Sequence, residues 1–460
     1  MPGPPKRAPI IPRWPRGPKP KRRTELGLLV FANIIIVLCY LLASEGQYSH
    51  IPPHLGPFLG ALVGLSLLAH LANRWLVPNA HPVVLPIAVL LNGIGYVVIA
   101  RWEPSFAKLQ SGWTAIAVVA YVLTLLVIRR SRDLDRYRYL LLLLAALLML
   151  APLVPHLGKE VNGARLWIRL GSASFQPVEI AKLLLCIFFA SYFAEKKELL
   201  SIPTARLGNR LVVDPRPLVP IIVAWGFAMF IIGVENDIGF AMLIFTLFIA
   251  LLWIATGRFG YLVLGVVLFA AGAYVTAHLF GQVHERVTIW LDPWKTLNTT
   301  GYQLGHAWFA LGTGGVGGTG FGLAPSSLVV PYVWSDMIFA GIGEEMGFIG
   351  ASAVVIGYLL LVGTGLRIAQ TARTDFSRLV ATGLTLILGF QAFFIMAGVL
   401  RLLPFTGITL PFMAYGGSAL VANYVLIALL MRISEEGSST PAEVASGVSQ
   451  PGEKAFVVAL

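Results

Sequence analysis

Charged side chains are scarce in this sequence. Only 12% of its 460 residues are Asp, Glu, Lys or Arg, whereas a soluble domain has about 25%. Hydrophobic residues make up 57% of the chain, and its mean hydropathy is +0.78. This composition excludes a set of soluble domains and predicts an all-α polytopic membrane protein.

Several chemical signatures are also missing. The two cysteines, Cys39 and Cys186, both lie in apolar runs and indicate packing rather than a disulfide framework. The eight histidines show no HExxH spacing, so the sequence indicates no metal site and no resident cofactor, although a divalent-cation requirement stays open. Residues 312–317 fit GxGxxG, but neither a preceding strand nor a GK[ST] sequence accompanies them. Nucleotide binding is therefore a poor interpretation.

Apolar runs dominate what is present. Each approaches the ~20 residues that cross the hydrocarbon. The runs cover 27–44, 58–77, 82–100, 112–128, 139–156, 176–194, 217–233, 238–256, 260–280, 337–363, 379–400 and 411–432. They predict about 12 transmembrane helices, with 10 or 11 still possible because only 234–237 separates the seventh run from the eighth.

The net charge of +12 sits mainly in the N-terminal tail and in alternate short loops. By contrast, the loops 45–57, 234–237 and 401–410 contain Arg401 as their single Lys or Arg. This asymmetry predicts that both termini are cytoplasmic. We expect three parts: a disordered basic tail over 1–26, a transmembrane domain over 27–436, and a disordered C-terminal tail over 437–460.

The interval 281–336 is polar and glycine-rich, although it lies between two apolar runs. A protein that only spanned the bilayer would need a short turn here. A long insert of charges, amides and glycines predicts a functional site at the surface of the membrane, on its outer face.

Asp336 ends this interval and directly precedes an apolar run. Partial desolvation at such a boundary raises a carboxyl pKa, which suits a general base that removes a proton from a hydroxyl. The alternative is that Asp336 caps the following helix.

Other ionisable residues border apolar runs. Glu179 and Lys182 share a helix face and form either a neutral structural pair or part of a cavity. Asp237 fits both helix capping and function, and Glu344 and Glu345 are expected to support the site from deeper in the membrane.

The glycines between 312 and 322 allow two interpretations. They permit close helix packing, or they expose backbone N–H groups, including those of Gly315 and Gly317, to a phosphate or sugar.

Taken in order, these residues resemble the SEDS family, which includes RodA, FtsW and SpoVE. The resemblance is carried by Asn162–Ile168, Gln176–Lys182, Asp237–Gly239, Ala255–Arg258, Arg286, Asp292–Pro293, Gly301–Gln303, Ser335–Ala340, Glu344–Gly347, Pro404–Gly407 and Leu410–Ser418. Three positions depart from the family pattern, since Val178 and Ala414 replace serines and Ser335-Asp336-Met337 stands where Thr-Asp-Phe is common. The number of spans before Glu179 is similar to that of longer actinobacterial RodA-like members, while FtsW and SpoVE stay possible.

The resemblance implies an inverting peptidoglycan glycosyltransferase that polymerises lipid II and works with a class B penicillin-binding protein. It implies that Asp336 is the catalytic base. Substrate contacts are then expected from Arg165, Gln176, Glu179, Lys182, Arg286, Gln303, Gly315 and Gly317. Supporting positions are expected at Asp237, Glu344, Glu345 and Tyr415. A lipid II flippase and a scaffold that only activates the penicillin-binding protein remain as alternatives.

Overall fold

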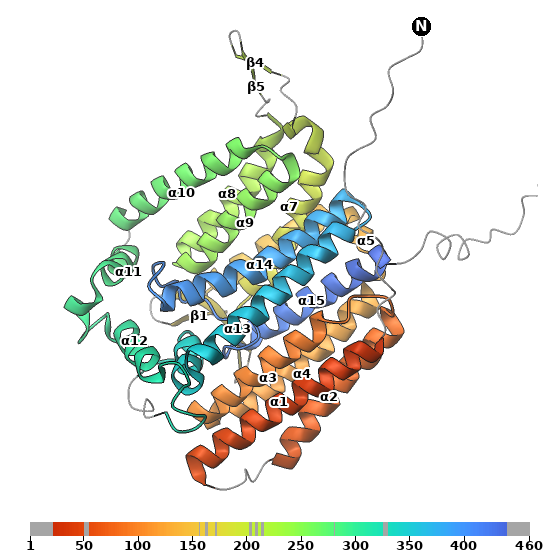
Figure 1. Cartoon of the computed structure of the whole chain (residues 1–460). Helices are drawn as coiled ribbons and strands as arrows, with labels where there is room; N and C mark the ends of the chain where they lie inside the picture. Colours follow the sequence, from red (N-terminus) through yellow and green to blue (C-terminus); the bar gives the residue numbers. More distant parts are fainter. Residues whose placement is uncertain are drawn as a thin grey trace, which may run out of the picture.

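The computed structural model describes residues 22–49, 55–155, 157–161, 164–170, 173–201, 205–207, 210–212, 216–279, 281–324 and 330–438. Residues 1–21 and 439–460, which form most of the two predicted tails, lie outside these ranges, as do Asn162 and Gly163. Helices dominate the described chain and pack as one bundle (Figure 1).

The helices are α1 (Arg22–Tyr48), α2 (Leu55–Leu76), α3 (Val84–Trp102), α4 (Pro104–Val127), α5 (Arg132–Arg136), α6 (Arg138–Leu150), α7 (Val178–Ser201), α8 (Val219–Val234), α9 (Ile238–Thr256), α10 (Phe259–Leu279), α11 (Gly281–Leu291), α12 (Tyr302–Gly314), α13 (Ile338–Thr371), α14 (Asp375–Val399) and α15 (Gly417–Ser438). Short 3₁₀ turns cover Ala151–Leu153, Arg216–Leu218 and Pro293–Thr296.

Each of the twelve apolar runs overlaps with a different helix. Ten described helices are long and apolar enough to cross a membrane. The other two runs belong to α6, which is shorter, and to α7, which carries charged residues near both ends. The predicted polytopic helical fold is confirmed.

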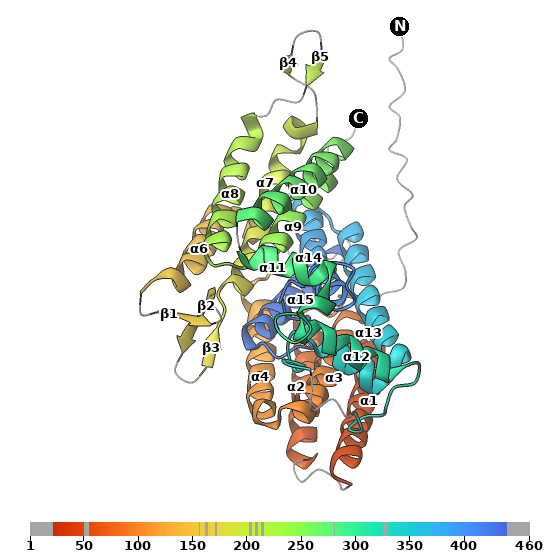
Figure 2. The same ribbon diagram turned by 90° about the vertical axis from the view of Figure 1, so that its left-hand side faces the viewer.

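Two small sheets were not predicted. The first contains β1 (Gly158–Val161), β2 (Ala164–Leu170) and β3 (Ala173–Phe175), all antiparallel, and lies beside α6 at the edge of the bundle (Figure 2). The second pairs β4 (Ala205–Leu207) with β5 (Arg210–Val212). Their strands are three to seven residues long and lie in the connections between apolar runs. Strand β2 alternates Leu166, Ile168 and Leu170 with Arg165 and Arg169, a strand signal that the sequence analysis missed.

The last apolar run also starts differently from its prediction over 411–432. Helix α15 begins only at Gly417, because residues 404–410 and 416 have no regular structure and 411–413 form a turn. Tyr358 of α13 donates its hydroxyl to the carbonyl of Pro411, which ties this non-helical segment into the core. A hydrophobic run therefore does not have to be a helix if other elements satisfy its backbone.

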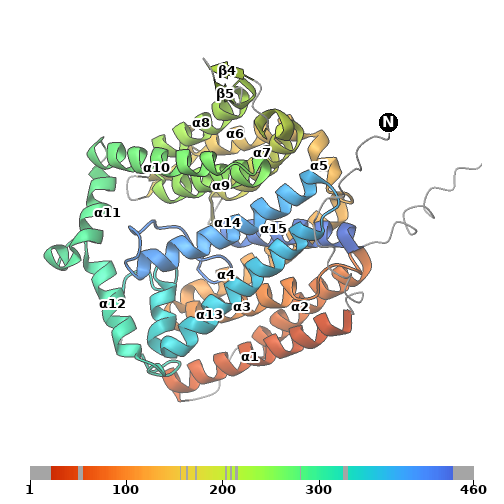
Figure 3. The ribbon, with the colours of Figure 1, turned by 45° about the horizontal axis from the view of Figure 1, so that its top comes forward.

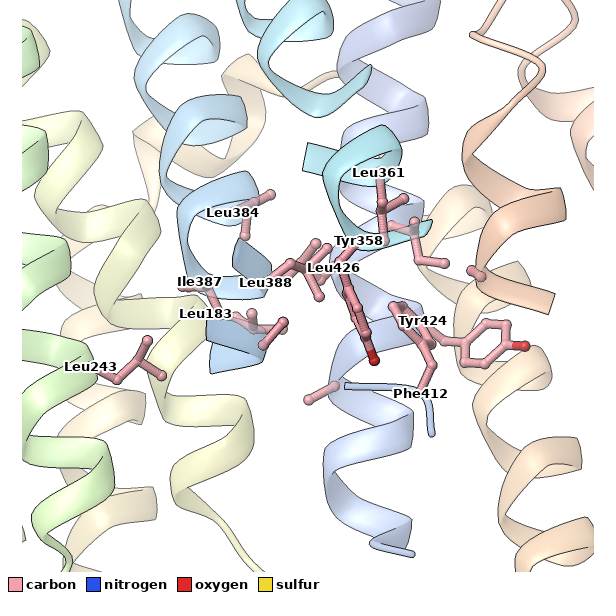
Figure 4. Close-up of a cluster of buried hydrophobic side chains, with 14 of the residues drawn as sticks. Leu183, Leu243, Tyr358, Leu361, Leu384, Ile387, Leu388, Phe412, Tyr424 and Leu426 are labelled. Atoms are coloured by element: carbon pink, nitrogen blue, oxygen red, sulfur yellow. The ribbon is translucent and has the colours of Figure 1, made fainter. Parts of the chain in front are cut away.

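The core lies where α7, α9, α13, α14 and α15 meet. Figure 4 shows side chains of this cluster, including Leu183, Leu243, Tyr358, Leu361, Leu384, Ile387, Leu388, Phe412, Tyr424 and Leu426, all buried. By contrast, α10 is largely exposed and continues into α11 and α12 along one edge of the bundle (Figure 3). The central helices therefore form the rigid frame that positions the loops at each end.

The alternating direction of the spanning helices places two sets of connections on opposite faces. One set contains the start of α1 and the end of α15. There, Arg432 donates to the carbonyls of Leu76 (3.0 Å), Leu125 (2.5 Å) and Ile128 (2.8 Å). The other set contains 235–237, 281–324, 330–337 and 400–416. It is joined by bonds from Trp290 to Arg401 O (3.0 Å) and from Trp308 to Val399 O (2.7 Å). Both described ends of the chain thus lie on the face opposite Asp336.

Helix α13 is broken at Gly347, whose φ of 65° and ψ of −166° are not helical. Residues 315–320 of the glycine-rich loop pack against this break. Four backbone hydrogen bonds join the two segments: Thr319 N to Glu344 O (2.9 Å), Gly320 N to Glu345 O (3.0 Å), Phe348 N to Gly315 O (2.9 Å) and Ile349 N to Val316 O (3.2 Å). The loop thereby satisfies backbone groups that the interrupted helix cannot.

We predict that Gly347→Ala destabilises the protein by about 3 kcal/mol or more, because this backbone region is accessible essentially to glycine alone. A Cβ at this position would also lie 2.2 Å from the nitrogen of Gly318. Gly363→Ala in the same helix is the control, since a Cβ there meets nothing within 4 Å. Thermal unfolding in detergent should show a large fall for Gly347→Ala and no fall for Gly363→Ala. Equal midpoints for the two variants would contradict the prediction.

Candidate active site

Asp336 lies in a turn over 331–337, immediately before α13. Tyr332 has a positive φ of 58°, and its carbonyl accepts hydrogen bonds from the backbone nitrogens of Ser335 (3.0 Å) and Met337 (3.2 Å). The N-cap of α13 is Met337, so Asp336 does not occupy the capping position. The alternative that Asp336 caps the helix is therefore wrong.

The environment of Asp336 changes its acidity. Its side chain keeps partial contact with solvent, although protein surrounds most of it. Burial raises the pKa of this carboxyl to about 7, against the opposing effects of a hydrogen bond from Ser335 and the positive charge of Arg286. A carboxylate with such a pKa is suited to accept a proton near neutral pH.

Arg286 of α11 connects Asp336 with a second carboxylate. Burial lowers the pKa of its guanidinium, while the charges of Asp237 and Asp336 raise it. Arginine nevertheless stays protonated in proteins. Its Nη1 donates to the carbonyls of Phe405 (3.3 Å) and Thr406 (2.8 Å). The cation therefore lies within electrostatic reach of both carboxylates and is anchored to the segment before α15.

Asp237 caps α9, where its side chain accepts a hydrogen bond from Phe240 N at 3.0 Å. Burial raises its pKa to about 6, whereas the Phe240 bond and Arg286 lower it and the charge of Glu179 raises it further. The capping interpretation of Asp237 is confirmed, and the same carboxylate is electrostatically coupled to the site. Asp336 and Asp237 thus face one cation but differ in what else they bind.

Glu235, two residues earlier, is only 1% exposed. Neither of its carboxyl oxygens has a hydrogen-bond partner among the described residues. Burial, followed by the charge of Asp237, raises its pKa to about 8. Glu235 is therefore mainly protonated at pH 7, which is how a buried carboxyl without a partner avoids the cost of a charge.

Glu179 and Lys182 form an ion pair near the start of α7, with Nζ and Oε2 2.5 Å apart, and both side chains are almost completely buried. Lys182 also donates to Gln391 Oε1 of α14 (2.8 Å), and Gln391 Nε2 donates to Thr409 O (3.0 Å). This chain of bonds links α7 to the segment that Arg286 anchors. Gln391 was missed by the sequence analysis, because a lone glutamine in an apolar run carries no spacing signal.

Two more predicted residues hold the turn of Asp336. Gln303 of α12 donates its side-chain amide to Pro331 O at 3.4 Å. The backbone nitrogen of Tyr415 donates to Trp334 O at 2.9 Å, and its ring stacks on Phe106 with centroids 4.5 Å apart. Gln303 and Tyr415 therefore position the turn. This agrees with the supporting role expected for Tyr415, and contact of Gln303 with a substrate stays a prediction.

The remaining predicted residues lie around this cluster. Gln176 lies two residues before α7 and is half-buried, and Arg165 is exposed on β2. Gly315 and Gly317 are exposed in the loop at the break of α13. The close-packing interpretation holds for other glycines of that loop, such as Gly318, where a Cβ would lie 2.2 Å from Glu345 O. Contacts of these four residues with a substrate stay predictions.

Glu344 and Glu345 lie where α13 meets the glycine-rich loop. Besides the backbone bonds of their carbonyls, Glu345 Oε1 lies 3.3 Å from Arg101 Nε of α3. Arg101 in turn donates to the carbonyls of Gly322 (3.2 Å) and Ala324 (3.3 Å). The pair thus fixes the end of the loop, and Arg101 is a second residue that the sequence analysis missed.

The chain is similar to known proteins along most of its length. The family model described as "Cell cycle protein", for FtsW, RodA and SpoVE, matches residues 85–439. "Peptidoglycan glycosyltransferase RodA" of Mycobacterium tuberculosis (strain ATCC 25618 / H37Rv) is 39% identical over 430 residues, 91% of each chain. "Probable peptidoglycan glycosyltransferase FtsW" of Nitrosomonas europaea is 31% identical over 79% of this chain and 95% of its own.

Solved structures are similar as well. One, described as "Structural coordination of polymerization and crosslinking by a peptidoglycan synthase complex", has a TM-score of 0.63 and 25% identity, and covers 77% of this chain and 97% of its own. The Thermus thermophilus Rod shape determining protein RodA has a TM-score of 0.56 and 23% identity, with coverages of 78% and 98%. At this identity the second similarity concerns the fold alone.

The buried pair allows a test of the two interpretations left open for it. Lys182→Met leaves Glu179 buried without its counter-charge, and we expect a cost of about 3–5 kcal/mol. The double variant Glu179→Gln/Lys182→Met removes both charges and should be less destabilised than Lys182→Met alone. Thermal unfolding of the variants in detergent measures this difference.

A double variant that is as destabilised as Lys182→Met, or more so, would contradict a coupled buried pair. A double variant that folds but lacks activity would assign the pair a functional role, whereas retained activity would make it structural.

Proposed function

The chain belongs to the FtsW, RodA and SpoVE family, and we propose that it polymerises lipid II as a peptidoglycan glycosyltransferase. Lipid II is the undecaprenyl-pyrophosphate-linked disaccharide pentapeptide. The relatives named as peptidoglycan glycosyltransferases cover most of the chain, which supports this activity. The observation that carries the catalytic assignment is a partly exposed Asp336 with a pKa of about 7 next to the fixed cation of Arg286.

In the proposed reaction, Asp336 accepts the proton of the 4-hydroxyl of the acceptor's N-acetylglucosamine. That oxygen attacks the anomeric carbon of the donor's N-acetylmuramic acid. A β-1,4 bond forms, the bond to the pyrophosphate oxygen breaks, and undecaprenyl pyrophosphate leaves. One displacement on an α-linked donor inverts the configuration, so the reaction needs no covalent enzyme intermediate.

Cations near the donor would stabilise the negative charge that develops on the leaving pyrophosphate. Lys182 is fully buried and bonded to Glu179 and Gln391. In our proposal it therefore acts mainly by holding the site together. Arg286, which is half-buried, and Arg165, which is exposed, are better placed to meet the substrate. A role for Gly315 and Gly317 in the same contact remains part of the proposal.

We propose that the face with Asp336 is extracytoplasmic. The opposite face carries the described arginines and lysines of alternate loops, among them Arg129, Arg130, Arg132, Lys196, Lys197, Arg258, Arg373 and Arg378. Such an excess marks the cytoplasmic side. Both termini would then be cytoplasmic. The similar structure of a peptidoglycan synthase complex supports a partnership with a class B penicillin-binding protein that crosslinks the strands.

Asp336→Asn and Asp336→Ala should each abolish detectable polymerisation, because general-base catalysis typically contributes about 10²–10⁴-fold. The measurement is gel resolution of glycan strands made from purified lipid II by detergent-solubilised protein with its penicillin-binding partner. Glu103→Gln is the control, since this half-buried carboxyl on the same face bonds to Ser105 outside the site. It should leave activity unchanged.

Strands of equal yield from Asp336→Ala and the unsubstituted protein would refute the catalytic assignment. Strands from neither preparation, with both proteins folded and the partner intact, would favour lipid II transport instead.

The pKa of Asp336 also predicts a pH profile. The base is active when deprotonated, so kcat/KM should rise with pH, reach half its maximum near pH 7, and fall about tenfold per unit below that. Arg286→Gln removes a charge that lowers this pKa, so its profile should shift to higher pH. Rates of strand synthesis from pH 5.5 to 9 measure both profiles. A midpoint that does not move in Arg286→Gln would contradict the coupling of the two groups.

A further inference from the structure

Helices α1 and α2 precede residue 85, where the family match begins. They carry a buried polar cluster of their own. Glu25 of α1 is 0% exposed and accepts hydrogen bonds from Asn73 Nδ2 (3.2 Å), with His70 Nδ1 at 2.8 Å. Tyr121 of α4 donates to Asn73 Oδ1 at 2.5 Å. The hairpin is thus attached to the bundle by specific polar contacts, as well as by apolar packing.

Above this cluster lies a cavity of about 450 Å³, lined by Arg22, Arg23, Leu26, His70, Arg74 and Pro78. Arg22 is fully engaged, because its guanidinium bonds to Glu25 and to the carbonyls of Val77 and Pro78. It neutralises the buried carboxylate. Arg23 and Arg74 are exposed, and they leave the cavity with an excess of two positive charges.

The position of the cavity narrows the choice of ligand. It lies at the first residue of α1 and in the last turn of α2, where both spans leave the hydrocarbon. Leu26, which is 43% exposed, provides an apolar wall on the membrane side. In sequence, residues 1–21 add Lys6, Arg7, Arg13, Arg16, Lys19 and Lys21 directly before α1, with no acidic residue. Basic clusters next to a spanning helix attract anionic lipid.

We propose that this cavity binds the headgroup phosphate of an anionic phospholipid between Arg23 and Arg74. Guanidinium groups match phosphate oxygens in paired hydrogen bonds, and the apolar wall receives the glycerol and the first methylenes of the lipid. The bound lipid joins α1 to α2 at the face opposite Asp336. This site is separate from the proposed catalytic centre and does not depend on it.

The test uses the full-length protein in detergent, titrated separately with phosphatidylglycerol, phosphatidylcholine and inorganic phosphate. Binding is read from the shift of the thermal unfolding midpoint and from lipids retained in native mass spectrometry. Arg23→Gln/Arg74→Gln should weaken phosphatidylglycerol binding about 30-fold, and Arg74→Gln alone about 5-fold. The single variant provides the test if the double variant folds poorly.

The matched control is Arg129→Gln/Arg130→Gln, which removes the same charge from two exposed arginines on the same face but outside the cavity. It should bind phosphatidylglycerol like the unsubstituted protein. If both double variants bound phosphatidylglycerol equally weakly, the effect would be one of general surface charge, and the proposed site would be wrong. Equal protection by phosphatidylcholine would also overturn it. Equal protection by inorganic phosphate would assign the cavity to free phosphate instead of lipid.

Discussion

A charge or backbone group inside a bilayer has no water to bind, so the protein itself must satisfy it. The pair of Glu179 and Lys182 meets this constraint and positions much of the site in doing so. Its buried ammonium recruits Gln391 of α14, and Gln391 holds the carbonyl of Thr409. Through these bonds the start of α7 fixes the segment before α15, to which Arg286 is attached. The ion pair thus organises elements distant in sequence.

The same constraint explains the glycine-rich loop. A break in α13 at Gly347 frees backbone groups at membrane depth, and the loop returns to bond them. Glycines are needed because the two backbones approach too closely for a Cβ at several positions. The ion pair of Glu345 with Arg101 then holds the loop from α3. The glycine-rich sequence that fits GxGxxG therefore serves in large part to supply hydrogen bonds to the backbone at the break in α13.

Two carboxylates near one arginine have different environments. Asp237 uses an oxygen to cap α9, which stabilises its charge, and its pKa is about 6. Asp336 lies in a turn outside the capping position, and its pKa is about 7. Local backbone geometry therefore decides which carboxylate is free to exchange a proton. Asp237 is also coupled electrostatically to Arg286, so it belongs to the same group of charges as Asp336, the proposed catalytic base.

The sequence by itself determined the helical membrane fold, the apolar runs and the neighbourhood of Glu179 with Lys182. The length of an apolar run and an i,i+3 spacing are local properties, so they can be recognised in the sequence without knowledge of the packing. Only the tertiary structure showed the roles of Gln391 and Arg101, the small sheets and the non-helical segment before α15. Lys182 and Gln391 are 209 positions apart, and no local sequence pattern predicts such a contact. Whether Asp336 caps a helix or faces a cation was likewise decided by packing, because both outcomes require the same residue at the same place.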